Sequence, residues 1–169
     1  MKEYPIEHDE VDLRPLQTGR MNPAEYGFVH PRTCLPCHDA FIEYQGGILL
    51  VKRLNPPIID ALWPIGGLVM RGVPIEESMR AKVRAESGLE LDDLTELGFG
   101  RTLFQTDPCG HGRGTDTINI AYFARGRGSL ALDKLHAEPT IVTPDQYRSL
   151  RDDMHSYVRD FMDLAIPLL

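Results

Sequence analysis

The clearest pattern of apolar and polar positions lies in the middle of the chain, where Ile75, Met79 and Val83 recur at every fourth position. That spacing is typical of the buried stripe of an amphipathic helix. Pro74 fixes a backbone angle that suits the start of a helix, and Gly88 suits the left-handed residue that ends one. The pattern predicts a helix between these two residues with one buried face.

A second stripe on the same helix is polar. Lys82 and Glu86 lie beside the buried stripe, so they can face a cleft. A double glycine, Gly66-Gly67, precedes the helix, and glycine lets a backbone approach a phosphate or a metal ion closely. A loop, a helix and an acidic stripe in this order are what a phosphate and metal site needs.

The remaining apolar runs predict strands around this helix. The predicted elements are strands at 39–44 and 48–53, the helix, strands at 96–105 and 117–124, a short strand at 140–143, and an amphipathic helix from 152 to about 165. This order predicts an α+β domain over residues 37–169, built as an α/β/α sandwich with a mixed sheet. Residues 1–36 are expected to form an N-terminal arm with little regular structure, because prolines and scattered charges recur there.

Composition narrows the class of protein. A chain of 169 residues with 42% hydrophobic content suits one domain with a substantial core. The net charge of −7 and the absence of a basic run disfavour binding to nucleic acid or to an anionic membrane. No apolar run reaches the roughly 18 residues that would span a bilayer, and the charged start lacks the apolar centre of a signal peptide. We therefore expect a cytoplasmic protein.

The cysteines raise a separate possibility. Three cysteines, an odd number, argue against a disulfide framework. Four side chains just outside predicted strands could form a zinc site between the arm and the Gly-rich loop at 106–116: Cys34, Cys37, Cys109 and His111. The alternative is reduced cysteines in packed loops. In the same loop Arg113 could contact a phosphate, or the loop could be only a mobile hairpin turn.

The segment around the predicted helix resembles the Nudix box, whose pattern is G-x5-E-x7-R-E-U-x-E-E-x-G-U, with U a bulky aliphatic residue. Aligned on Gly67, the pattern matches at Gly67, Val83, Glu86, Gly88 and Leu89. It departs at Val73, Ala81, Lys82 and Ala85, where Glu, Arg, Glu and Glu are expected. Because the glutamates of the family hold Mg²⁺, the resemblance implies a reduced metal site.

The flanking residues are similar to one branch of that superfamily, the GDP-mannose mannosyl hydrolases. The Leu-Leu-Val-Lys-Arg-Leu-Asn-Pro-Pro run at 49–57 leads to Trp-Pro-Ile-Gly-Gly at 63–67, and the box ends Ala-Glu-Ser-Gly-Leu at 85–89. The branch also lacks the glutamate that Lys82 replaces. A histidine, His136, precedes the Thr-Pro-Asp turn at 143–145, as in the branch. The similarity covers roughly residues 37 to 160.

This resemblance implies hydrolysis of a nucleoside diphosphate sugar with Mg²⁺, in which water attacks the anomeric carbon with inversion. His136 would be the general base, a role that suits imidazole because its ordinary pKa lies near neutrality. Glu86 and the backbone carbonyl of Gly66 would hold the metal ion. Arg53 would bind a diphosphate oxygen and assist the leaving group, and Asp39 would lie at the nucleotide end of the cleft.

Two departures from the branch leave alternatives open. Leu135 stands where the branch has a glutamine that binds the metal, and leucine cannot replace it. The ammonium of Lys82 could take the place of a missing cation and contact the substrate, or it could form a solvated ion pair within the helix. The chain is therefore a hydrolase of a nucleotide sugar or related derivative, or a catalytically silent module that binds nucleotides. In either case we expect a homodimer.

Overall fold

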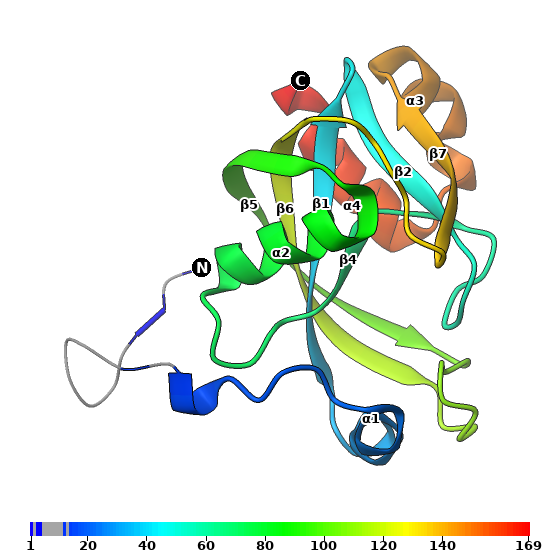
Figure 1. Cartoon of the computed structure of the whole chain (residues 1–169). Helices are drawn as coiled ribbons and strands as arrows, with labels where there is room; N and C mark the ends of the chain where they lie inside the picture. Colours follow the sequence, from blue (N-terminus) through cyan, green and yellow to red (C-terminus); the bar gives the residue numbers. More distant parts are fainter. Residues whose placement is uncertain (2, 5–11, 13) are drawn as a thin grey trace.

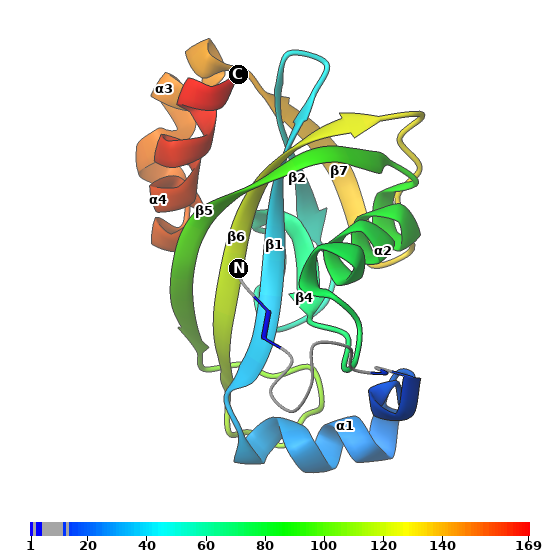
Figure 2. The same ribbon diagram turned by 90° about the vertical axis from the view of Figure 1, so that its left-hand side faces the viewer.

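A computed structural model of the chain describes residues 1, 3, 4, 12 and 14–169. In this part, a seven-stranded mixed sheet lies between helices, with α2 on one face and α3 and α4 on the other (Figures 1 and 2). The elements are α1 (Pro23–Val29), β1 (Leu35–Tyr44), β2 (Gly47–Arg53), β3 (Leu62–Trp63), β4 (Ile65–Leu68), α2 (Ile75–Ser87), β5 (Glu90–Phe104), β6 (Thr115–Arg127), β7 (His136–Val142), α3 (Pro144–Leu150) and α4 (Ser156–Ala165), with short 3-10 turns between some of them. The predicted α/β/α sandwich is confirmed.

The strand order is β3-β2-β1-β6-β5, with β4 added to β1 and β7 added to β2. β1 and β6 run parallel, and the other pairs are antiparallel. β1 pairs with β4 over Cys37–Ala40 and with β2 over Ile42–Tyr44. β2 and β4 therefore part from each other along β1, and we call the place where they part the fork.

Two apolar cores hold the helices to the sheet. The core under α2 contains Ile75, Met79 and Val83, each no more than 2% exposed, so the predicted buried stripe is confirmed. Gly88 ends α2 in the left-handed conformation with φ +71°, as its position predicts. The core under α4 contains its apolar stripe, including Phe161. Among the described residues, no helix is both long and apolar enough to cross a bilayer.

The N-terminal arm contains more regular structure than predicted. The side chain of Asn22 accepts hydrogen bonds from the backbone N–H groups that begin α1, and the Glu25 carboxylate accepts from the Asn22 N–H. This capping box, with Pro23 in the first turn, stabilises a short helix. The prediction of little regular structure was wrong for residues 23–29. Residues 2, 5–11 and 13 of the arm lie outside the described part of the chain.

The arm also contacts the segment that leads into α2. The Arg71 guanidinium donates a hydrogen bond to the Leu16 carbonyl at 2.7 Å, and the Gln17 amide donates to the Gly72 carbonyl at 3.1 Å. Residues 14–17 therefore pack on their own domain near the start of α2.

Several strands are longer than predicted: β6 spans Thr115–Arg127 instead of 117–124, and β7 spans His136–Val142 instead of 140–143. β1 begins at Leu35, because Leu35 and Pro36 pair with β6. β5 spans Glu90–Phe104 instead of 96–105, and its pairing with β6 shifts register twice, between Asp92 and Thr95 and between Glu96 and Gly98. Such irregularities break the alternation of apolar and polar residues, so the first half of β5 carries no clear strand pattern.

Candidate active site

The double glycine lets α2 approach the backbone of the fork. Gly66 lies opposite Asp39 in the β1–β4 pair, and a side chain at position 66 would overlap the Asp39 carboxylate and the His38 carbonyl. Gly67 has φ +146°, and a methyl group there would lie 3.0 Å from Nζ of Lys82. Gly66 therefore allows close pairing with β1, and Gly67 allows the Lys82 side chain of α2 to lie against β4.

Glu86 is the central acidic residue of this site and is 6% exposed. Its Oε1 lies 2.6 Å from Nζ of Lys82. Its Oε2 is buried, has no hydrogen-bond partner among the described residues, and lies 4.0 Å from Nε2 of His136. An unpartnered carboxylate oxygen in a buried place is costly, so this atom is a candidate cation ligand.

His136 is held in place by Asp133. Nδ1 of His136 donates a hydrogen bond to Oδ1 of Asp133 at 2.8 Å, because a carboxylate can only accept. Nε2 is then the acceptor, and it faces Glu86. The backbone N–H of Asp133 also donates to the Glu86 carbonyl at 2.9 Å. The loop before β7 is thereby fastened to the last turn of α2, where carbonyls lack partners within the helix.

This arrangement fits one divalent cation. One ligand atom from each of Glu86, Asp133 and His136 lies within 4.8 Å of the other two, and no other such group of three occurs in the described part of the chain. Two carboxylates and an imidazole form a donor set that divalent metal ions accept. Because Asp133 and His136 are hydrogen-bonded to each other, the ligand atom of this group that has no partner among the described residues is Oε2 of Glu86.

Arg53 lies beside this group. It is opposite His136 in the β2–β7 pair, so the two side chains share one face of the sheet. Burial lowers the pKa of Arg53, while the charges of Asp39 and Glu86 raise it. One Nη donates to the Pro56 carbonyl at 3.3 Å, and the buried Nε has no partner among the described residues. The guanidinium therefore has one buried donor with no partner in the described part of the chain.

Asp39 has different partners from those predicted. It is 4% exposed, and its Oδ2 accepts a hydrogen bond from the Tyr157 hydroxyl at 2.6 Å. Burial raises the pKa of Asp39 to about 6, against the lowering effects of the Tyr157 hydrogen bond and of the charges on Arg53 and Lys82. A contact between Asp39 and a nucleotide stays a prediction.

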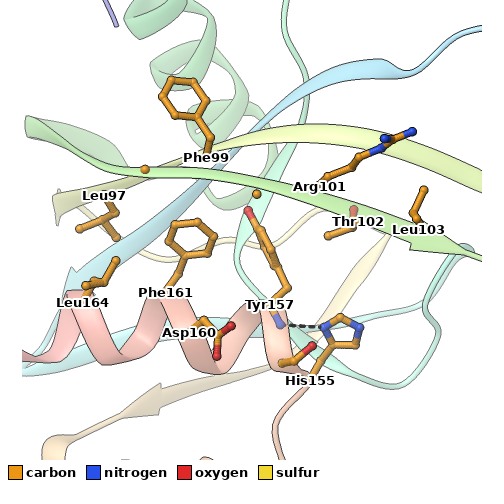
Figure 3. A pocket seen from close by; sticks show the side chains of 13 residues that line it. Leu97, Phe99, Arg101, Thr102, Leu103, His155, Tyr157, Asp160, Phe161 and Leu164 are labelled. Carbon is orange, nitrogen blue, oxygen red and sulfur yellow. Dashed lines mark hydrogen bonds between the residues drawn. The ribbon is translucent and has the colours of Figure 1, made fainter.

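The ring of Tyr157 lines a cavity of about 590 Å³ between α4 and β5 (Figure 3). Tyr157 and Phe161 point from α4 toward β5, where a methyl group on Gly100 would lie 2.8 Å from the Tyr157 ring. Neither Glu86 nor His136 lines this cavity. The cavity is therefore separate from the charged group at the fork.

Arg113 lies elsewhere in the fold. It lines a second cavity of about 310 Å³ with residues 30–34 that follow α1, and neither Glu86 nor His136 belongs to that lining. Its role as a phosphate contact stays a prediction.

The predicted zinc ligands are not brought together in the described part of the chain. Cys37 is buried in β1, Cys109 is exposed, and both are free thiols. Nε2 of His111 lies 2.7 Å from Nδ1 of His30. The backbone N–H of His111 donates a hydrogen bond to the Asp107 carboxylate. The loop is organised by Asp107 and by this pair of histidines.

Sequence reasoning missed Asp133 and Tyr157 as parts of the site. The Asp-x-x-His spacing of Asp133 and His136 is a signal that could have been read, because a carboxylate three residues before an imidazole can reach it. Tyr157 belongs to the buried stripe of α4, and no local pattern shows that its hydroxyl reaches β1.

No protein-family model and no curated protein matches this sequence. Solved structures of the same fold do. A MutT NUDIX hydrolase from Burkholderia pseudomallei is 19% identical, with a TM-score of 0.61 over 78% of this chain and 98% of that one. A NUDIX hydrolase from Nitrosomonas europaea is 16% identical, with a TM-score of 0.59 over 78% and 87%. A bifunctional NMN adenylyltransferase/ADP ribose pyrophosphatase from Francisella tularensis, complexed with AMP and a manganese ion, is 14% identical, with a TM-score of 0.55 over 80% and 41%. The fold of this chain is that of the Nudix hydrolases.

Proposed function

We propose, from this fold and this group of side chains, that the protein hydrolyses a nucleoside diphosphate sugar or a related nucleoside diphosphate derivative. The observation that carries the proposal is the pairing of His136 and Glu86. Nδ1 of His136 is held by Asp133, and Nε2 faces a buried carboxylate oxygen that has no partner among the described residues. This pairing supports a general base beside an anionic ligand for a cation.

In the proposed reaction, His136 acts as the general base. Its Nε2 takes a proton from water while the water oxygen bonds to the anomeric carbon of the sugar, and the bond from that carbon to the diphosphate oxygen breaks. The nucleoside diphosphate leaves with the electron pair of that bond. Arg53 and Lys82 offer positive charge to the diphosphate, and Asp133 keeps the imidazole in the tautomer that can accept the proton.

Glu86 and the Gly66 carbonyl are the proposed ligands of a divalent ion such as Mg²⁺, while Nε2 of His136 is kept for water. When bound, such an ion neutralises charge on the diphosphate. The Francisella protein of the same fold was solved with a nucleotide and manganese, which supports a nucleotide and a divalent ion as ligands here. Zinc binding and the homodimer stay predictions.

The role of Asp133 can be tested by Asp133→Asn. Because an amide can present either its oxygen or its N–H₂ to Nδ1, we expect the fixed tautomer of His136 to be lost and kcat to fall by about 10- to 100-fold, with KM little changed. Nitrogen NMR of the imidazole reports the tautomer and rates report kcat. A fall in kcat without a change in the NMR signature of His136 would contradict the positioning role.

The function is tested by incubating the purified protein with Mg²⁺ and a panel of nucleotide sugars. We expect free sugar and a nucleoside diphosphate as products, because attack at carbon leaves the diphosphate whole. Sugar phosphate would mean attack at phosphorus. The alternative of a silent binding module predicts no turnover and a nucleotide affinity, measured by calorimetry, that neither Mg²⁺ nor a chelator changes.

A further inference from the structure

The ion pair between Lys82 and Glu86 is not a solvated pair on a helix surface. Nζ of Lys82 lies 2.6 Å from Oε1 of Glu86, and the two side chains are only 17% and 7% exposed. A pair on the surface contributes little, whereas a buried pair is held closely and each member depends on the other. The solvated pair considered from the sequence is therefore excluded.

The Lys82 ammonium faces the fork. A methyl group on Gly67 would lie 2.9 Å from Cε and 3.0 Å from Nζ, so the end of the side chain lies against β4. Its positive charge lowers the pKa of Asp39 and of His38, two residues of β1. The ammonium thus lies among the same strands that carry the candidate active site.

Position 82 is a glutamate in the Nudix pattern that this chain resembles. A lysine in its place makes the local charge two units more positive. Glu86 pairs with Lys82, and the charges of Asp39 and Glu86 raise the pKa of Arg53, so the protein itself supplies two cations here. Because part of the charge that metal ions otherwise supply is already present, a diphosphate meets a site with fixed positive charge.

We propose that the Lys82 ammonium is a built-in cation of this site, which holds Oε1 of Glu86 with one N–H and donates its others to a diphosphate, so that the protein binds diphosphates without a divalent ion. An ammonium has three donors, so it serves the carboxylate and a phosphate together. The Arg53 guanidinium, whose Nε has no partner among the described residues, supplies the second charge. This inference rests on the proposed function only for the chemical class of the ligand.

Calorimetry with inorganic pyrophosphate in the presence of EDTA tests the inference without any turnover. We expect the unaltered protein to bind, and Lys82→Met to weaken binding by about 10- to 100-fold, the range for a lost hydrogen bond between charged groups. Arg84→Met is the matched control. It removes the same charge from the same helix, but its side chain is 62% exposed and pairs with Glu90, so binding should not change.

Lys82→Met leaves Glu86 buried without its partner and can lower stability. A second comparison avoids this, because Glu86→Gln is nearly isosteric and the double variant Lys82→Met/Glu86→Gln buries no unpaired charge. In EDTA, Glu86→Gln should bind pyrophosphate at least as tightly as the unaltered protein, since Lys82 loses a competing anion. The double variant should bind about 10- to 100-fold more weakly than Glu86→Gln. Equal affinities of these two variants would overturn the inference, and so would pyrophosphate binding that requires Mg²⁺.

The outcomes separate this inference from the proposed function. Pyrophosphate binding that depends on Lys82 in a protein that hydrolyses no nucleotide sugar would uphold the built-in cation and reject the hydrolase. The opposite result is also possible: the protein hydrolyses a nucleotide sugar, but its binding of pyrophosphate in EDTA does not change in Lys82→Met. That result would uphold the hydrolase and reject the built-in cation.

Discussion

The His136→Gln variant is expected to lose about 10²- to 10⁴-fold in kcat, the usual contribution of a positioned general base. Glutamine keeps a polar side chain of similar reach but cannot take a proton from water near neutral pH. KM should change little, because Nε2 of His136 is assigned to the water and not to the diphosphate. Initial rates with the best nucleotide sugar of the panel, in Mg²⁺, give both constants.

His155→Gln is the matched control for this prediction. His155 is exposed, its ring lies 5.1 Å from the Trp63 ring, and it does not belong to the group around Glu86. Its substitution should leave the rate unchanged. Thermal unfolding of both variants shows whether either is misfolded. A folded His136→Gln protein that keeps more than about a tenth of the rate would reject the base role.

His38 and Asp39, two buried neighbours in β1, should change the free energy of unfolding in opposite directions as the pH falls. Burial lowers the pKa of His38 to about 4, from an ordinary value near 6.5. Between these values the unfolded chain binds a proton on His38 and the folded protein does not, so stability falls as the pH falls. Burial raises the pKa of Asp39 to about 6, so between pH 6 and about 4 the folded protein binds the extra proton and stability rises as the pH falls.

Each shift of about two units corresponds to about 3 kcal/mol, so in the unaltered protein the two contributions nearly cancel between pH 6.5 and 4. Substituting one of the two residues leaves the contribution of the other to stability uncancelled. As the pH falls from 6.5 to 4, the free energy of unfolding of His38→Gln should rise by about 3 kcal/mol relative to that of the unaltered protein. The free energy of unfolding of Asp39→Asn should fall by about 3 kcal/mol relative to the same reference.

Urea unfolding at pH 6.5, 5 and 4 measures these differences. Asp152→Asn serves as a control, because the Asp152 side chain is 93% exposed and lies outside the core. Its profile should run parallel to that of the unaltered protein. If both β1 variants also gave parallel profiles, the two groups would not be buried as the structure has them.

Much of the fold could be predicted because its signals are local. α2 is marked by Pro74, Gly88 and a buried stripe within thirteen residues, and the β1–β2 hairpin by Gln45-Gly46-Gly47. α1 differs from its prediction because prolines recur around it, a pattern typical of irregular chain. Its capping box between Asn22 and Glu25 is also local and could have been recognised.

The candidate site could be predicted only where one residue carries the signal. Glu86, His136 and Arg53 were named from the sequence, and the structure brings them together at the fork. Asp133 carries a local signal in its spacing to His136, but its place beside Glu86 depends on a backbone hydrogen bond across 47 positions of the chain. Whether a buried carboxylate such as Asp39 faces a ligand or a tyrosine is decided by packing between α4 and β1, which no local pattern reports.

In the proposed mechanism, water is activated beside Glu86 and attacks a sugar carbon. Hydrolysis in ¹⁸O-labelled water, followed by mass spectrometry of both products, tests it most directly. We expect the label in the free sugar and an unlabelled nucleoside diphosphate. Label in a phosphate group would contradict it.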